Sequence, residues 1–218
     1  MKKQGILEKF SNKVMPIASK IGNEKHLTSI SQGMFLSLPF MVIGAFFLIL
    51  ANPPIDLKHV DLRTGNIFLQ FLIGWKKWAL LNYNTITVPY TLTFGLVGLI
   101  SAFGIAYYLA KAYKMTAISD GLISLVVYLI VCVELKNNTI NLDYLGSNGL
   151  FIAIILGLLT VEISRLFDNL NWKIKLPDSV PSMVSNFINS LLPLFINILV
   201  FYGFNLLSLV TTKLALPA

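Results

Sequence analysis

The chain has 218 residues, of which 56% are hydrophobic and 12% are charged, and its mean hydropathy is +0.74. Because soluble domains carry about 25% charged residues, so few charges could not cover the surface of a water-soluble globule. The 17 Lys and Arg outnumber the 10 Asp and Glu, but they are scattered around apolar stretches, which argues against a nucleic-acid partner and favours contact with anionic lipid headgroups.

The first 26 residues are basic and amphipathic. Apolar side chains recur there at helical spacing, and lysines fill the other positions. The apolar residues are Ile6, Phe10, Val14, Ile17 and Ile21, and the lysines are Lys2, Lys3, Lys9, Lys13, Lys20 and Lys25. We predict that residues 1–26 form an amphipathic helix in the headgroup plane, kinked at Pro16. The apolar run that follows is too long for a signal peptide, so we expect the segment to be retained.

Five apolar stretches are long enough to cross the hydrocarbon core as helices. They lie near residues 29–51, 88–110, 117–135, 147–167 and 183–212. The run 52–54, Asn-Pro-Pro, ends the first stretch, and Pro89 falls in the first turn of the second, where proline is tolerated. The sequence therefore predicts an all-α membrane protein, with a bundle of five transmembrane helices in residues 27–218.

Residues 66–82 are apolar but carry Lys76 and Lys77 at their centre, where charges are costly in a bilayer. Six residues share one face of this predicted helix: Phe68, Phe71, Leu72, Trp75, Trp78 and Ala79. Tryptophans on such a face are typical of a helix at the membrane surface. We therefore predict an interfacial helix at residues 66–82, with a sixth span as the alternative.

The distribution of cations predicts the orientation of the chain. With five spans and the N-terminus inside, 11 of the 17 Lys and Arg lie on the inner side. The positive-inside rule then places the N-terminus in the cytoplasm. A sixth span at residues 66–82 would invert the later loops and weaken this bias.

The second span carries a stripe of small residues. Gly98, Ala102, Ala106 and Ala110 repeat every four residues. Small side chains at this spacing let helix backbones approach closely in lipid. We predict that the stripe packs against another helix, within the chain or in a dimer.

The last span places polar residues on one face. They are Asn186, Asn189, Ser190, Pro193 and Asn197. Asparagine facing lipid is costly, so this face should point at protein or at a watery cavity. Contact between helices is the favoured interpretation, and substrate contact by Asn186, Asn189 and Asn197 is the alternative. Asp120 and Glu134 are interpreted as polar ends of the third span rather than as proton carriers.

Motifs of common enzyme sites are missing from the sequence, which has no Gly-rich phosphate loop, no His-x-x-x-His pair and no Cys-x-x-Cys. Its two histidines, His26 and His59, lie in polar connections and are interpreted as solvated. The single cysteine, Cys132, lies in an apolar span where its thiolate is disfavoured. Glu162 and Arg165 are three residues apart and are expected to pair on a helix surface. We predict no catalytic residue, no metal site and no cofactor.

Two segments resemble a known family. The first comprises Phe10-Ser-Asn-Lys-Val-Met-Pro-Ile-Ala-Ser-Lys-Ile21, His26-Leu27, Gln32-Gly33, Pro39, Ile43-Gly44 and Ala51-Asn52-Pro53-Pro54. The second comprises Leu176-Pro-Asp-Ser-Val-Pro181 followed by Val184, Ser185, Phe187, Leu192 and Pro193. Together they resemble the N-terminal half of the Enzyme IIC sugar permeases of the bacterial phosphoenolpyruvate-dependent phosphotransferase system, in the lactose/cellobiose/diacetylchitobiose family.

The resemblance implies a permease about twice as long, with ten spans. Its N-terminal half would form the dimer and the scaffold, and its C-terminal half would bind the sugar. It further implies import of a β-linked disaccharide or similar oligosaccharide, which is phosphorylated by the partner IIB, with IIA as a further partner. No position of this chain matches the substrate-contact residues of the family. We therefore expect the chain alone to insert into the membrane and dimerise, but neither to bind nor to phosphorylate sugar.

Two other classes of protein stay open on the residues alone. One is the capture subunit of a vitamin importer, which has about this length and five or six spans, with the asparagine face of the last span lining its pocket. The other is a structural or assembly protein without a ligand. The Pro-Asp-Ser-Val-Pro loop and the Asn-Pro-Pro run favour the permease.

Overall fold

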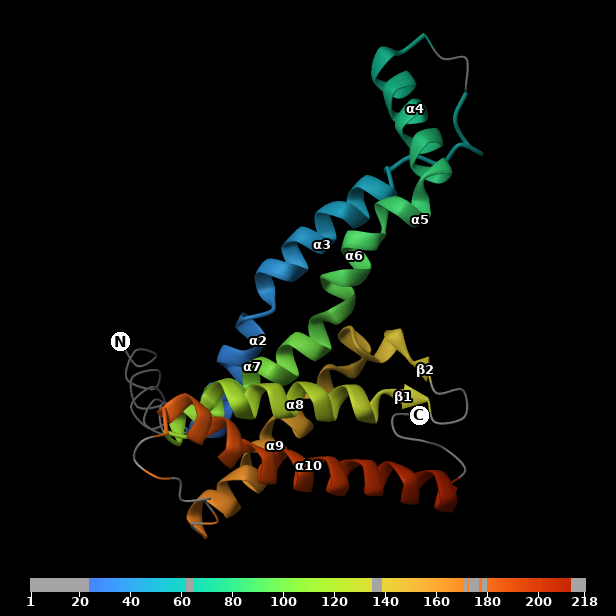
Figure 1. Ribbon diagram of the computed structural model, residues 1–218. Helices are drawn as coiled ribbons and strands as arrows, with labels where there is room; N and C mark the ends of the chain where they lie inside the picture. The colour runs from blue at the N-terminus through green and yellow to red at the C-terminus, as the bar shows by residue number, and fades with distance from the viewer. Residues whose placement is uncertain are drawn as a thin grey trace, which may run out of the picture.

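A computed structural model of the chain describes residues 24–61, 65–134, 139–170, 172, 177 and 180–212 and is mostly helical (Figure 1). In chain order the elements are α2 (Lys25–Phe35), α3 (Leu38–Ala51), α4 (Ile67–Leu81), α5 (Tyr83–Ile86), α6 (Val88–Leu92), η1 (Phe94–Leu96), α7 (Val97–Ala112), α8 (Ala117–Val131), β1 (Val133–Glu134), β2 (Thr139–Ile140), η2 (Leu142–Tyr144), η3 (Ser147–Gly149), α9 (Leu150–Asn169) and α10 (Ser182–Thr212). Most of the helix predicted at residues 1–26 lies outside the described residues, as do parts of the loop 176–181.

Four helical segments of the described chain are long and apolar enough to cross a membrane. They are Lys25–Ala51, Tyr83–Ala112, Ser147–Asn169 and Val184–Leu207. These segments overlap four of the five predicted spans. Large apolar side chains stay exposed along them, for example Phe46, Phe151 and Phe195, each more than half exposed. Such surfaces suit lipid tails rather than water.

The third predicted span, residues 117–135, is wrong at its end. Helix α8 has 15 residues and stops at Val131, so it is about 22 Å long and shorter than the hydrocarbon core. The next two residues pair as strand β1 with β2, Val133 opposite Ile140 and Glu134 opposite Thr139. The hairpin also corrects the all-α prediction. The described chain thus has four candidate spans and a shorter apolar helix where the sequence predicts five spans.

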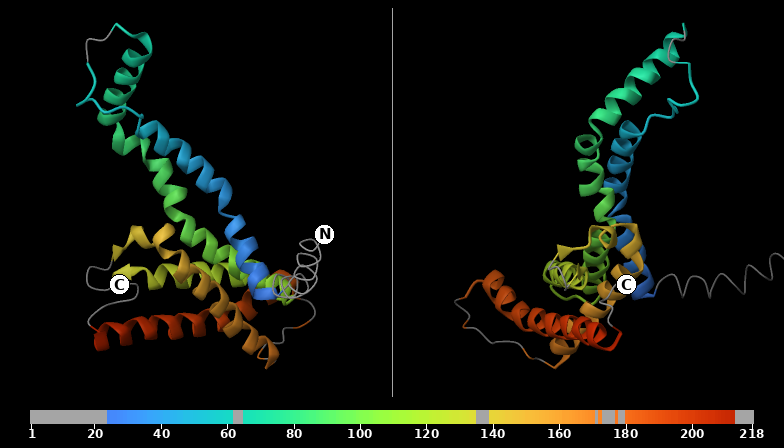
Figure 2. Two further views of the ribbon diagram at one scale, coloured as in Figure 1. Left: turned by 180° about the vertical axis from the view of Figure 1, so that it is seen from behind. Right: turned by 90° about the vertical axis from the view of Figure 1, so that its right-hand side faces the viewer.

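The first two spans are not continuous helices. The first breaks at Leu36 and Ser37, just before Pro39, and the second breaks around Thr93. The second break packs against the middle of α3, because a Cβ added at Gly44 would be only 2.6 Å from the Cβ of Phe94 in η1. Beyond the breaks, α3 and α6 run together and carry α4 at the far end from the rest of the bundle (Figures 1 and 2).

Helix α4 forms where the sequence predicts an interfacial helix. The Asn66 side chain caps its start by accepting hydrogen bonds from two backbone N–H groups. The indole N–H of Trp75 donates to the carbonyl of Leu50 at 2.9 Å, and Lys76 reaches the carbonyl of Pro53 at 3.5 Å. These contacts tie α4 to the end of the first span. Its position at the membrane surface stays a prediction.

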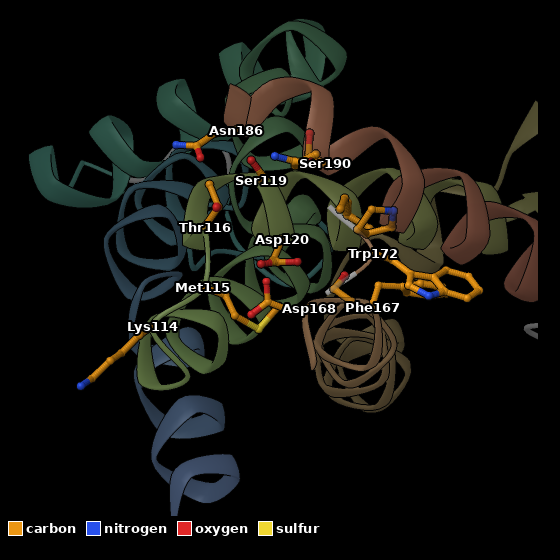
Figure 3. Close-up of a pocket in the computed structure, with 14 residues that line it drawn as sticks. Lys114, Met115, Thr116, Ser119, Asp120, Phe167, Asp168, Trp172, Asn186 and Ser190 are labelled. Atoms are coloured by element: carbon orange, nitrogen blue, oxygen red, sulfur yellow. The ribbon is translucent and has the colours of Figure 1, made fainter. Parts of the chain in front are cut away.

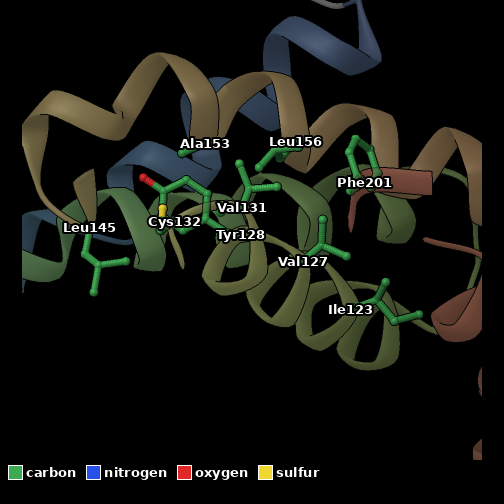
Figure 4. Packing of buried hydrophobic residues seen from close by; sticks show 10 residues of the cluster. Ile123, Val127, Tyr128, Val131, Cys132, Leu145, Ala153, Leu156 and Phe201 are labelled. Carbon is green, nitrogen blue, oxygen red and sulfur yellow. The ribbon is translucent and has the colours of Figure 1, made fainter. Parts of the chain in front are cut away.

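Helix α7 is the centre of the bundle and packs against α2, α8 and α9. The side chains of Ala102, Ala106 and Ala110 are fully buried in it, and Gly98 is buried as well. Figure 4 shows the apolar cluster that α8, α9 and α10 form beside α7. The small-residue stripe therefore lies against the chain's own helices, and a dimer would have to use another surface.

One backbone position in this region is strained. Lys114 has φ of 62° and follows α7 in a left-handed turn, with the Met115 N–H donating to the Ala110 carbonyl at 2.9 Å. This hydrogen-bond pattern is the helix end that usually carries glycine. We expect Lys114→Gly to raise the free energy of unfolding by about 0.5–1 kcal/mol, measured by denaturant titration in detergent. Lys111→Gly, inside the last turn of α7, should lower it by a similar amount. Equal effects of the two changes would contradict this explanation.

Candidate functional site

A polar pocket lies at the end of the bundle where α8 and α10 begin and α7 and α9 end (Figure 3). Its volume is about 160 Å³. The lining residues that carry polar side chains are Lys114, Thr116, Ser119, Asp120, Ser164, Asp168, Trp172, Asn186, Asn189 and Ser190. Three separate stretches of the chain therefore supply its polar groups.

Two carboxylates, those of Asp120 and Asp168, line the pocket. Asp120, in the first turn of α8, is 5% exposed and hydrogen-bonds with the hydroxyl of Ser164 on α9. Asp168, one turn further along α9, lies close enough for its charge to act on Asp120, and Figure 3 shows the two carboxylates in the same part of the pocket. Asp120 thus lies at the end of the predicted third span, as the sequence indicates, but it is buried against α9. Buried carboxylates need hydrogen-bond donors or cations, so the pocket suits a polar guest.

The asparagine face of the last span divides between two roles. Asn186 and Asn189 line the pocket. Asn197 instead is fully buried against α9. Its amide donates to the carbonyl of Pro193 at 2.9 Å and lies 3.4 Å from the Ser164 hydroxyl. Asn197 is thus placed as a contact between helices, whereas the first two residues face a cavity.

A second group of polar side chains, the helix-end cluster, joins the starts and ends of three helices. It consists of Glu24, His26, Tyr113, Glu162 and Arg165. The predicted pair of Glu162 and Arg165 is confirmed, at 3.3 Å. The prediction of a solvated histidine is wrong for His26, which contacts two carboxylates, but it holds for His59, which is 82% exposed.

The remaining candidate side chains are acidic residues, histidines and one cysteine. Among the described residues, no three His, Cys, Asp or Glu side chains gather where they could hold a metal ion. Cys132 is buried at the end of α8. The pocket and the cluster can bind polar or charged groups and can hold helices together. Sequence reasoning missed Asp168, Glu24 and Tyr113, for which the only signal is their position at helix ends.

The fold and these polar sites define an integral membrane protein made of several helices. Residues 31–217 match the family model described as phosphotransferase system, EIIC. The chain therefore belongs to the EIIC family of the phosphotransferase system.

Curated relatives support this assignment. The chain is 34% identical over 197 residues to the lichenan permease IIC component of Bacillus subtilis (strain 168), covering 84% of this chain and 41% of the relative. It is 32% identical over 199 residues to the cellobiose-specific EIIC component of Geobacillus stearothermophilus, with the same coverage of 84% and 41%. The chain thus spans about two fifths of the length of these relatives.

A solved structure is similar to this fold. It is the crystal structure of the transporter ChbC, the IIC component from the N,N'-diacetylchitobiose-specific phosphotransferase system. The TM-score is 0.78 at 30% sequence identity, covering 95% of this chain and 48% of the other. Family membership decides against the vitamin-importer subunit.

Proposed function

We propose that this chain is the N-terminal scaffold of an EIIC permease that imports and phosphorylates a cellobiose-, lactose- or chitobiose-type oligosaccharide. The match of residues 31–217 to the family carries the proposal. Relatives named for lichenan, cellobiose and diacetylchitobiose support the class of sugar. On this proposal residues 27–218 form the scaffold domain, and the remainder of the permease supplies the sugar pocket.

The proposed topology has five spans with the N-terminus in the cytoplasm. Helix α8 would be the short span, completed on the far side by the β1–β2 hairpin. Since α2, α8 and α10 begin at the same end of the bundle, the polar pocket and the helix-end cluster would both face the cytoplasm. Residues 1–26 and α4 would lie at the two membrane surfaces.

The proposed partners are membrane lipid, a second copy of the chain, the remainder of the permease, and the IIB and IIA proteins. The buried small-residue stripe leaves the dimer to other faces, such as the exposed apolar side chains of α3. Asn186 and Asn189 keep the role of candidate substrate contacts because they line a cavity. Asn197 loses that role because it is buried between α9 and α10.

Sugar uptake tests the proposal. Cells of Bacillus subtilis without their lichenan permease would express residues 1–218 alone, or joined to the part of that permease that this chain does not match. We expect no uptake of labelled cellobiose by the chain alone and uptake by the joined protein. The control is the lichenan permease with its own N-terminal part joined at the same position. Uptake by the chain alone would contradict the scaffold role, as would an inactive joined protein beside an active control.

A further inference from the structure

The helix-end cluster holds the first turn of α2 against the far end of α9. The His26 ring contacts Glu24 through Nδ1 at 2.7 Å and Glu162 through Nε2 at 3.0 Å. Glu162 belongs to α9, 136 positions along the chain. The imidazole is therefore the bridge between the start of the first span and the fourth predicted span.

The bridge needs a proton on each ring nitrogen. A neutral imidazole has one N–H donor, whereas an imidazolium has two. Since both partners are carboxylates, which accept when ionised, only the imidazolium donates to Glu24 and Glu162 at the same time. Loss of the Nε2 proton leaves a lone pair facing the Glu162 carboxylate at 3.0 Å, and the Tyr113 hydroxyl, 3.3 Å from Nε2, is then the neighbour that can donate to it. The bond from His26 to α9 is lost.

The other groups around the ring keep their charge state near neutral pH. The hydrogen bond from the His26 side chain lowers the pKa of the Glu24 carboxyl. Burial, with the bond to Glu162, raises the pKa of Tyr113 to about 12. The charges of Lys25 and Arg165 lie over the Tyr113 ring, at 4.9 and 4.0 Å from its centroid. Histidine is the side chain whose ordinary charge change lies nearest neutral pH, so His26 is the member of the cluster considered as the proton switch.

The tie between α7 and α9 does not need this proton. The Tyr113 hydroxyl donates to Glu162 at 2.6 Å, and Arg165 bonds the other carboxylate oxygen at 3.3 Å. Helix α2 is held separately at Gly33, which packs on the backbone of Gly104 and Ile105 in α7. Ser29, one turn after Lys25, is buried as well. The first turn of α2 is therefore the part whose attachment to α9 depends on the His26 bridge.

We infer that His26 is a proton-dependent latch: when protonated it closes the first turn of α2 onto α9, and when neutral it releases that turn while Ser29 and Gly33 stay packed. The latch does not rest on the proposed transport function, because it uses only contacts within this chain.

Hydrogen exchange measured by mass spectrometry tests the latch, on the full chain in lipid nanodiscs at pH 5.5 and 8.5. After correction for intrinsic exchange rates, we expect amides 26–32 to lose about tenfold protection at the higher pH, as one charge-assisted hydrogen bond is lost. Amides 102–109 in α7 should not change. Equal protection of residues 26–32 at both pH values would overturn the inference.

Variants separate the latch from general unfolding. His26→Gln should hold residues 26–32 in the less protected state at both pH values. His59→Gln is the matched control, since His59 pairs with Asp56 in an exposed loop at 2.8 Å. This variant should keep the difference in amide protection between pH 5.5 and 8.5. If the protection of residues 26–32 still differs between the two pH values in His26→Gln, the inference is overturned. If His26→Gln does not fold, the difference in protection that the unsubstituted chain shows between the two pH values tests the inference by itself.

Discussion

Gly33→Ala should lower the free energy of unfolding by about 3 kcal/mol, the upper end of the range for overpacked interiors. The added Cβ would overlap the backbone nitrogen of Ile105 and lie 2.6 Å from its Cα. Backbone cannot rotate away as a side chain can, so α2 and α7 would have to separate. Gly104→Ala should act in the same way, because its Cβ would lie 2.7 Å from the Gly33 carbonyl oxygen. Denaturant titration of the purified chain in detergent measures both effects.

Two other helical glycines provide matched controls for this prediction. A Cβ added at Gly74 in α4 or at Gly203 in α10 meets nothing within 4 Å. Because alanine is the better helix former by up to about 1 kcal/mol, these changes should be neutral or stabilising. A loss at Gly74 or Gly203 as large as that at Gly33 would show that close helix approach is not the cause.

The sequence predicted the end of the first span and the bounds of the 66–82 helix, because the types of residue change abruptly at these positions. Asn52 and the two prolines after it end an uncharged apolar run, and α3 stops at Ala51. The segment 66–82 could be assigned to a helix because its apolar residues, from Phe68 to Ala79, repeat with helical spacing. Its helix runs from Ile67 to Leu81. Patterns local to one element were therefore enough for these boundaries.

Features that depend on a second segment were missed. The end of α8 depends on Thr139 and Ile140, which pair with the strand that follows it. Nothing in the apolar run 117–135 indicates that pairing. The break at Thr93 likewise lies against Gly44 of another helix. Helical periodicity within one segment cannot show a break that packs against another helix.

The candidate site shows the same limit. Spacing placed Asn186, Asn189 and Asn197 on one face of the last span, but it could not show that only the first two line a pocket. Asp120 and Asp168 are 48 positions apart and meet only because α8 and α9 pack together. The spacing of the small residues revealed the stripe on α7. It could not show that the stripe lies among the chain's own helices α2, α8 and α9.

Tyr128→Ala should lower the free energy of unfolding by about 3–5 kcal/mol, the range for removing a buried aromatic ring. The ring is fully buried in the cluster between α8 and α9, as Figure 4 shows. Its hydroxyl also lies 2.5 Å from the carbonyl of Tyr144 and 3.1 Å from that of Gly149. One side chain therefore fills the core and holds the η2–η3 turn, so its truncation removes both contributions.

Tyr128→Phe isolates the hydroxyl, because the ring stays in place. We expect a loss of about 1–3 kcal/mol, since the change removes the donor from the buried carbonyls of Tyr144 and Gly149. Faster hydrogen exchange of residues 142–149 should accompany it. Tyr202→Phe, at a side chain of α10 that is 40% exposed, is the control and should change stability by less than about 0.5 kcal/mol. If Tyr128→Phe behaves like the control, the hydroxyl does not hold the turn and the ring alone stabilises the core.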